Sequence, residues 1–271
     1  MRNFFRYILD LFPRYASTYR QIRDQLDKKS PPILTPWGFT LAGSPLMASG
    51  RFEKNETLLI RKLLSDVDLF VNVGANIGYY CCHALSLNKF VIAIEPVQRN
   101  LHYLLKNIKN NSWESKCDVF PVAVGESTNI LNIWGGGTGA SLLKGWASIP
   151  DSYVTQVPVI SLDRLLSGAI EGKKTLIMID IEGAELMLLK GAVNTLANDV
   201  RPIWIVEINS TEHQPGSTTF NPNFYSTFDI FFKNGYKSFM VNESLNEINC
   251  DNLIDFSKNS EFTNVQNFLF M

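Results

Sequence analysis

The stretch Leu69-Phe-Val-Asn-Val-Gly-Ala-Asn-Ile-Gly78 decides the fold of this chain. An apolar run leads directly into a turn that contains two glycines, and a helical pattern follows the turn. A second apolar run, residues 90–94, ends at Glu95, which lies 21 residues after Gly74. A strand-to-helix turn with glycines and an acidic residue about 20 positions later is typical of a nucleotide-type pocket at the carboxyl edge of a parallel sheet.

The spacing of the two glycines narrows the class of ligand. Gly74-Ala-Asn-Ile-Gly78 is not the G-x-G-x-x-G pattern of dinucleotide-binding folds, and no P-loop lysine is present. The sequence also contains no Tyr-x-x-x-Lys pair. A nicotinamide-dependent oxidoreductase, which has the same architecture, is therefore a disfavoured alternative.

Strand and helix patterns alternate through most of the chain. We expect strands at residues 68–73, 90–94, 119–124, 175–180 and 202–208, with helices between them, and closing strands at residues 236–241 and 267–270. Continuous β-branched runs separated by amphipathic helices indicate a mostly parallel sheet that is covered on both faces. The predicted fold is thus α/β and Rossmann-like, with seven strands, a late reversed strand and an N-terminal helical extension.

The predicted domain organisation has two parts. Residues 1–50 form an extension, with two amphipathic helices in the first 30 residues and a strand or hairpin at residues 35–41, and residues 51–271 form the main domain. The helices are expected to pack on their own domain or on a second subunit, as in a homodimer. Their arginines and aromatic residues also allow peripheral contact with a membrane surface.

Two helices and one insertion complete the pattern. Asn55 is a plausible N-cap for a helix over residues 55–65, and Leu186, Leu189, Val193 and Leu196 mark another helix. Residues 129–159 suggest an inserted hairpin, whose glycine-rich stretch at residues 135–139 is either a linker or a lid that faces the substrate.

Three motifs carry a resemblance to a known family. Val73-Gly-Ala-Asn-Ile-Gly78, then Ile94-Glu-Pro96 with Asn100, then Ile179-Asp-Ile-Glu-Gly-Ala-Glu185 stand in this order at the ends of apolar strand patterns. The chain resembles the FkbM family of S-adenosylmethionine-dependent methyltransferases from about residue 51 to residue 207. The resemblance implies a class I methyltransferase fold and S-adenosylmethionine as the cofactor.

The resemblance also implies which residues bind the cofactor. The glycine turn and Asn76 would hold the methionine end, and Glu95 would accept hydrogen bonds from both ribose hydroxyls. The adenine would lie beyond the third strand, near Ala123 and Val124. The implied cofactor-binding residues are Asn72, Gly74, Ala75, Asn76, Gly78, Glu95, Pro96, Asn100, Ala123, Val124 and Asp180.

Asn72 departs from the family pattern, which usually has an acidic residue at this place. A carboxylate there, near the amino group of the cofactor, would favour the positive charge of that group, whereas an asparagine adds no charge. The departure lowers cofactor affinity unless Glu56 or another acid compensates for it.

Carboxylates at strand ends are the main catalytic candidates. Asp180, Glu182 and Glu207 follow or end buried strands, where a carboxylate is able to act as general base towards an alcohol. Asp180 serves equally well to order the methionine end, and Glu185 is better explained as a helix cap. His213 is a candidate base or an ordinary surface histidine.

Composition excludes several classes of function. The formal net charge is −1, with 25 basic and 26 acidic residues, which argues against a general affinity for nucleic acid. The four cysteines show no metal-ligand spacing, so free thiols in a cytoplasmic protein are expected. No metal site is predicted, although converging carboxylates are able to bind Mg²⁺. No signal peptide or transmembrane segment is predicted.

The sequence therefore predicts methyl transfer from S-adenosylmethionine to a hydroxyl oxygen of a small molecule or a glycan, in the first place a sugar. The absence of an Asn/Asp-Pro-Pro-Tyr/Phe motif after the fourth strand argues against nitrogen as the acceptor atom. The alternative is a non-catalytic module that binds a partner through its N-terminal helices.

Overall fold

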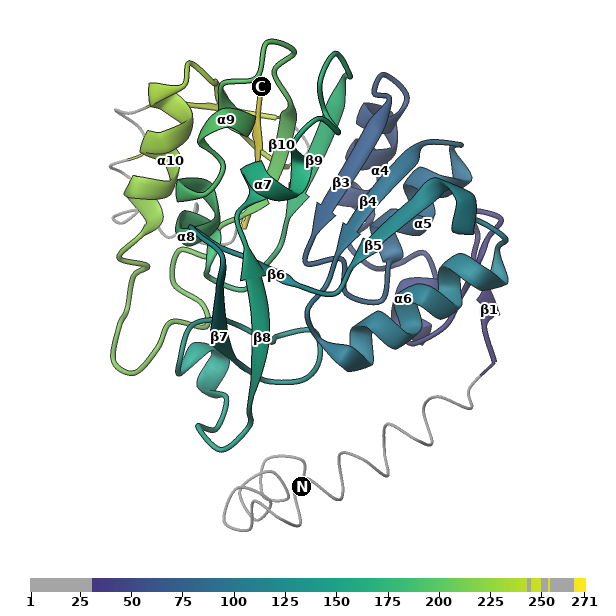
Figure 1. Cartoon of the computed structure of the whole chain (residues 1–271), viewed down its shortest axis with the longest axis horizontal. Coiled ribbons are helices and arrows are strands. Elements are labelled where there is room, and N and C mark those ends of the chain that lie inside the picture. The colour runs from purple at the N-terminus through teal and green to yellow at the C-terminus, as the bar shows by residue number, and fades with distance from the viewer. Residues whose placement is uncertain (1–30, 243–244, 250–252, 254–265) are drawn as a thin grey trace.

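The computed structural model describes residues 31–242, 245–249, 253 and 266–271, and the two helices expected within residues 1–30 lie outside this part. Its centre is an eight-stranded sheet (Figure 1). The strands, in their order across the sheet, are β12 (Glu247–Ile248), β11 (Ser238–Met240), β13 (Asn267–Phe270), β10 (Ile203–Glu207), β9 (Thr175–Ile179), β3 (Leu69–Val73), β4 (Phe90–Ile94) and β5 (Cys117–Phe120).

Seven of these strands correspond to the predicted sheet. The strands from β10 to β5 are parallel to one another, and β13 is antiparallel to both of its neighbours, β10 and β11. The reversed strand is therefore the last one in the chain, as expected. The eighth strand, β12, adds two residues at the edge next to β11, a length too short to produce a hydrophobic pattern in the sequence.

Helices cover both faces of the sheet, and each face has its own hydrophobic core (Figure 1). Alternate residues of β3 contribute to the two cores, with Val71 on one face and Phe70 on the other. One face is covered by α4 (Lys54–Leu64), α5 (Tyr79–Ser86) and α6 (Gln98–Asn110), and the other by α7 (Leu162–Leu166), α8 (Glu185–Lys190), α9 (Val193–Leu196) and α10 (Phe224–Lys233). Three single-turn elements are α3 (Pro45–Ala48), η1 (Glu114–Lys116) and η2 (Trp146–Ser148).

The predicted hairpin near residues 35–41 is present as β1 (Ile33–Leu34) and β2 (Thr40–Leu41). Asn107 of α6 and Asn111, the C-cap residue of that helix, fix the end of the hairpin to the main domain. Asn111 accepts a hydrogen bond from the backbone N–H of Thr40 at 2.9 Å, and Asn107 accepts one from that of Ala42 at 2.7 Å. The amide nitrogens of both asparagines also donate to the backbone carbonyls of the same two residues. Each side-chain amide therefore pairs with the backbone N–H and carbonyl of one hairpin residue.

The predicted strand at residues 119–124 is wrong as a single element. β5 ends at Phe120, and β6 (Ala123–Val124) joins a separate three-stranded sheet with β8 (Val154–Ile160) and β7 (Asn129–Trp134). Pro121 explains the break, because proline has no N–H to donate to a sheet, and the chain turns there with Val122 N–H bonded to the Phe120 carbonyl. The pair β7 and β8 is the inserted hairpin that the sequence predicts.

Two helix predictions also need correction. Helix α4 begins at Lys54, and Glu53 before it has a left-handed φ of 40°, so Asn55 lies inside the helix and is not its cap. The helix expected across Leu186 to Leu196 breaks into α8 and α9 at Gly191. A Cβ at Gly191 would overlap the carbonyl oxygen of Gly125, so close packing against this neighbouring turn accompanies the break.

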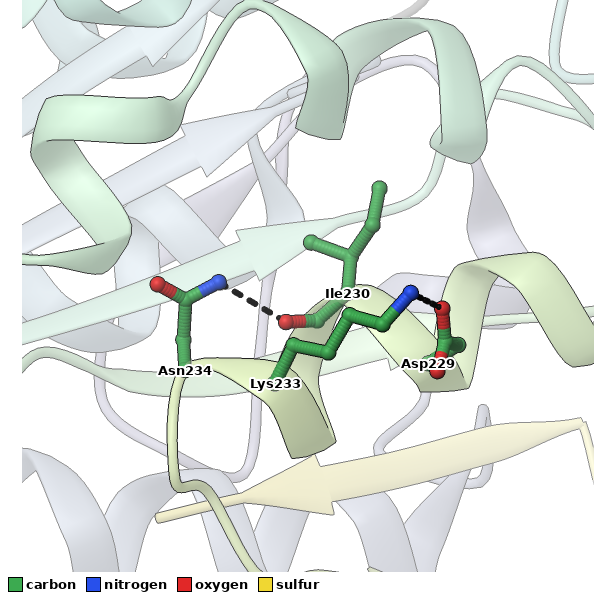
Figure 2. A network of polar contacts seen from close by, with 4 residues as sticks. All are labelled: Asp229, Ile230, Lys233 and Asn234. Atoms are coloured by element: carbon green, nitrogen blue, oxygen red, sulfur yellow. Dashed lines mark hydrogen bonds and ion pairs between the residues drawn. The ribbon is translucent and has the colours of Figure 1, made fainter.

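Helix α10 ends as the sequence predicts, at Asn234-Gly235 (Figure 2). The Asn234 side-chain amide donates a 2.8 Å hydrogen bond to the carbonyl of Ile230, and Gly235 has a φ of +77°. Lys233 forms an ion pair of 2.5 Å with Asp229, one turn earlier, and both side chains are mostly exposed. The amide and the glycine therefore end this helix, while the exposed ion pair adds little stability.

Candidate active site

A pocket opens at the carboxyl ends of β3, β4 and β9, the edge at which ligands bind in open α/β sheets. Most of the residues implied for cofactor binding line this first pocket: Gly74, Asn76, Glu95, Pro96, Asn100, Ala123, Val124 and Asp180. The strand ends thus bring together residues that are up to 106 positions apart.

Glu95 is the buried carboxylate of the first pocket, with 3% of its surface exposed. Its Oε2 accepts a 2.7 Å hydrogen bond from the backbone N–H of Asn76, and its Oε1 accepts one of 2.7 Å from that of Val97. Burial raises the pKa of Glu95 to about 7, although these hydrogen bonds counteract the rise. The side chain is therefore held in one orientation at the end of β4, as a group that binds two adjacent hydroxyls requires.

Two buried carbonyl oxygens of this pocket have no hydrogen-bond partner, Oδ1 of Asn76 and Oδ1 of Asn100. The Asn100 amide nitrogen donates to Oε1 of Glu95 at 3.4 Å and to the carbonyl of Gly137 at 3.2 Å, which fixes the orientation of the amide. A buried acceptor without a donor is costly, and a ligand with N–H and O–H groups would satisfy both oxygens. An adenosine group fits this requirement.

Each of the two glycines of the turn is required for a different structural reason. Gly74 has a φ of +83°, and a Cβ there would overlap the carbonyl oxygen of Asp180, so the glycine lets the ends of β3 and β9 approach each other. Gly78 precedes α5 with a φ of +85° and packs against the side chain of Leu104. Gly78 lies outside the described lining of both pockets, and its contact with Leu104 gives it a role in helix packing.

A second pocket adjoins the first and shares Gly74, Asn76, Thr138, Asp180 and Glu182 with it. Strand alternation explains three of its polar residues. Asn72, Asp180 and Glu207 all point to the face that carries α4, α5 and α6, because Phe70, Met178 and Ile205 belong to the core of that face. Four carboxylates line this second pocket: Glu53, Asp180, Glu182 and Glu207.

Neighbouring carboxylates raise the pKa of two residues of the second pocket, Asp180 and Glu207. Burial, followed by the charges of Glu207 and Glu182, raises the pKa of Asp180 well above its usual range. Burial and the charges of Glu182 and Glu185 raise the pKa of Glu207 to about 8. The cluster therefore disfavours a full set of negative charges, and perturbed pKa values of this kind are concentrated at functional sites.

Glu182 is held by one hydrogen bond to its carboxylate and one to its backbone carbonyl. Its Oε2 accepts a 2.7 Å hydrogen bond from the indole N–H of Trp146, and its backbone carbonyl accepts one of 2.6 Å from the Ser141 hydroxyl. Its φ of 57° is unusual for a residue with a side chain, and strain of this kind is concentrated at functional sites. Burial raises the pKa of Glu182, while the Trp146 hydrogen bond lowers it.

Two further candidates lie outside both pockets. Glu185 is buried and accepts a 2.9 Å hydrogen bond from the backbone N–H of Gly183, in agreement with the expectation of a structural cap. His213 is exposed, and its ring centroid lies 6.0 Å from that of Trp146. His213 thus lies outside the described lining of both pockets, although its charge lowers the pKa of Glu182.

Sequence reasoning missed Glu53 and Trp146. Glu53 lies before α4 and accepts a 2.5 Å hydrogen bond from the Tyr80 hydroxyl, and Trp146 lies in the insertion between β7 and β8. Neither residue belongs to a motif or a periodic pattern. The polar residues at the strand ends predicted the position of the site, but they gave no indication that Glu53 and Trp146 belong to it.

Within the described ranges, no group of three or more histidine, cysteine, aspartate or glutamate side chains is arranged to hold a metal ion. The helices of the same ranges include none that is both long enough and apolar enough to cross a membrane. Cys81, Cys82 and Cys117 are free thiols.

The fold and its family are now defined. A parallel sheet with helices on both faces and a reversed strand next to its last parallel strand is the class I methyltransferase fold. The family model of the methyltransferase FkbM domain matches residues 72–238, more than half of the chain. This chain therefore belongs to the FkbM methyltransferase family.

Solved structures include three similar proteins from bacteria. The FkbM methyltransferase from Methylobacillus flagellatus KT is 18% identical with a TM-score of 0.47, and the alignment covers 76% of this chain but only 44% of that protein. An O-methyltransferase from Bacillus cereus, in complex with SAH, is 11% identical with a TM-score of 0.43, covering 84% of this chain and 80% of that one. A SAM-dependent methyltransferase from Agrobacterium tumefaciens is 8% identical with a TM-score of 0.45, and the alignment covers 89% of this chain and 68% of that one. A search of curated proteins finds no significant match.

Proposed function

We propose that this chain transfers a methyl group from S-adenosylmethionine to a hydroxyl oxygen of a small molecule or a glycan, in the first place a sugar. The observation that carries the proposal is the meeting of two pockets at Asp180 and Glu182. The first pocket has the carboxylate and the unsatisfied acceptors that suit an adenosine group. The second pocket has carboxylates that suit a hydroxylated acceptor.

The bound cofactor would supply an activated methyl group on a sulfonium, and the protein would position the acceptor and receive its proton. Glu182 is the proposed base, because it lines both pockets and its carboxylate is oriented by Trp146. Asp180, at the end of β9, is proposed to order the methionine end. Glu207, which accepts a 2.9 Å hydrogen bond from Asn209, is proposed to hold an acceptor hydroxyl.

The lining of the second pocket favours an acceptor without negative charge. Among the described residues that line it there is no lysine, arginine or histidine, while four carboxylates are present. A phosphorylated or carboxylated acceptor would add negative charge beside these carboxylates, whereas the amino acid end of the cofactor is a zwitterion whose ammonium group offsets its own carboxylate. A neutral polyhydroxylated ring is able to donate hydrogen bonds to the carboxylates and to rest on apolar groups such as Phe52 and Leu46.

Calorimetric titration of the purified chain tests the cofactor. We expect S-adenosylmethionine and S-adenosylhomocysteine to bind, NAD not to bind, and Glu95→Gln to weaken both cofactor complexes. An acceptor screen then compares neutral sugars with the corresponding sugar phosphates, and methylation of the neutral sugars alone is expected. Binding of NAD in place of the two sulfur compounds would refute the proposal.

A further inference from the structure

Asn72 presents an unsatisfied acceptor to the second pocket. The residue is 2% exposed and lines that pocket, and its amide nitrogen donates to Sγ of Cys81 at 3.5 Å. Its Oδ1 has no hydrogen-bond partner among the described residues. An amide oxygen that faces a pocket without a donor favours a ligand that brings one. Asn72 has no charge, however, so it binds a cationic donor only weakly by itself.

Glu53 supplies a carboxylate to the lining of the same pocket. It lies immediately before α4, and its Oε2 accepts a 2.5 Å hydrogen bond from the Tyr80 hydroxyl, which fixes one oxygen. Glu53 also raises the pKa of Asp180 and of Glu207 through its charge, so its carboxylate acts within the same cluster. The left-handed φ of 40° at Glu53 is a strained conformation that places this side chain at the pocket.

The position of this pair relative to the first pocket indicates which part of a ligand it meets. The two pockets share Gly74 and Asn76, and Asn76 N–H is bonded to Glu95, the proposed ribose carboxylate. A cofactor whose adenosine occupies the first pocket therefore extends its amino acid end past this shared wall into the second. There it reaches the pocket that Asn72 and Glu53 line.

We propose that Glu53 holds the α-ammonium group of the cofactor's methionine end, with Oδ1 of Asn72 as a second, uncharged acceptor. This inference rests on the proposed function. An ammonium group has three N–H donors and no acceptor, so it requires several oxygens and at least one negative charge. Glu53 thereby replaces the charge that is missing at position 72. Glu56, the other nearby acid, lies within α4 and outside the described lining of both pockets.

The test compares two ligands that differ in the amino acid end. S-adenosylhomocysteine carries the α-ammonium group, and 5′-methylthioadenosine lacks the whole amino acid portion. Calorimetry on the full chain should show that Glu53→Gln lowers the affinity for S-adenosylhomocysteine about 10- to 100-fold, the usual effect of losing a hydrogen bond to a charged group. The affinity for 5′-methylthioadenosine should not change. Glu56→Gln removes the other nearby acid, whose charge raises the pKa of Glu53, and should weaken neither ligand.

Asn72→Asp provides a second and independent variant. In the Glu53→Gln background, Asn72→Asp should raise the affinity for S-adenosylhomocysteine at least tenfold. As a single variant it should also raise that affinity, without changing the affinity for 5′-methylthioadenosine. The thermal midpoint of each variant verifies that it is folded.

Three results would overturn the inference. Equal binding of S-adenosylhomocysteine by Glu53→Gln and the unmodified chain would remove Glu53 from the site. An equal loss of affinity for both ligands in Glu53→Gln would show that the substitution acts structurally on the first pocket. Binding of neither ligand by the unmodified chain would refute the proposed function, and the inference with it.

Discussion

The indole nitrogen of Trp146 donates a 2.7 Å hydrogen bond to Oε2 of Glu182. Trp146 is fully buried, and Gly183 packs so closely on its ring that a Cβ at this position would overlap the indole. The insertion between β7 and β8 therefore orients the carboxylate that follows β9. This contact links a segment outside the core fold to the proposed base.

Trp146→Phe should reduce activity at neutral pH about tenfold, the usual value of a hydrogen bond to a charged group. The hydrogen bond lowers the pKa of Glu182, so its loss raises that pKa and leaves less of the base ionised. The rising limb of the pH–rate profile should therefore move to higher pH. A profile with unchanged position would contradict this role, and Trp113→Phe, outside both pockets, is the control.

Glu182→Gln should lower turnover by about 10²- to 10⁴-fold, the range for loss of a general base, because glutamine cannot accept the proton of the acceptor hydroxyl. Cofactor affinity should remain nearly intact, since Gln keeps the size of the side chain. Single-turnover kinetics and calorimetry on the same preparation separate the two effects. Undiminished turnover would remove Glu182 from the mechanism.

Gly74→Ala should destabilise the protein by more than the conformational cost alone. Its φ of +83° costs a residue with a Cβ about 1–2 kcal/mol, and the added carbon would also overlap the carbonyl oxygen of Asp180. Gly168→Ala is the matched control, with a φ of +75° and open space around it. Urea denaturation should show a larger loss of unfolding free energy for Gly74→Ala than for Gly168→Ala. Equal losses would show that the close approach of Gly74 to Asp180 does not contribute.

Asn107→Ala should destabilise the protein by about 3 kcal/mol, because three hydrogen bonds are lost in a buried place. Asn107 accepts from the N–H of Ala42 and donates to the carbonyls of Ala42 and Ile77. Asn110→Ala, at an exposed position of the same helix, should change stability by less than about 0.5 kcal/mol. Chemical denaturation of both variants makes the comparison, and a similar effect of the two changes would contradict the role of the amide.

The stability of the ligand-free protein should fall as the pH rises from about 5 to 8. Burial raises the pKa of Glu185 from 4.5 to about 7, so the folded state holds a proton that the unfolded state releases. This contribution is complete below the unfolded pKa and is lost as the pH rises through the folded pKa. Urea unfolding at several pH values should show a smaller slope for Glu185→Gln. An identical slope for both proteins would contradict the assignment.

Much of the fold follows from local patterns. The predicted bounds of β4 and β13 agree with the structure to the residue, and β4 is a short apolar run between Lys89 and Glu95. The errors lie where a tertiary contact or a proline acts, at the break between β5 and β6 and at Gly191. The glycine turn, Glu95 and the strand-end carboxylates were also predicted as a set, since parallel strands end at a common edge.

The sequence alone determined the order of the strands along the chain, the family and the edge at which the site lies. Period-two alternation and the Gly-Ala-Asn-Ile-Gly turn are local features, and each is complete within a few residues. Only the tertiary structure decided that Glu53 and Trp146 join Asp180 and Glu182. Their side chains reach the site because α4 and the insertion fold over the sheet edge, and such long-range contacts depend on packing across the whole domain, which no local pattern records.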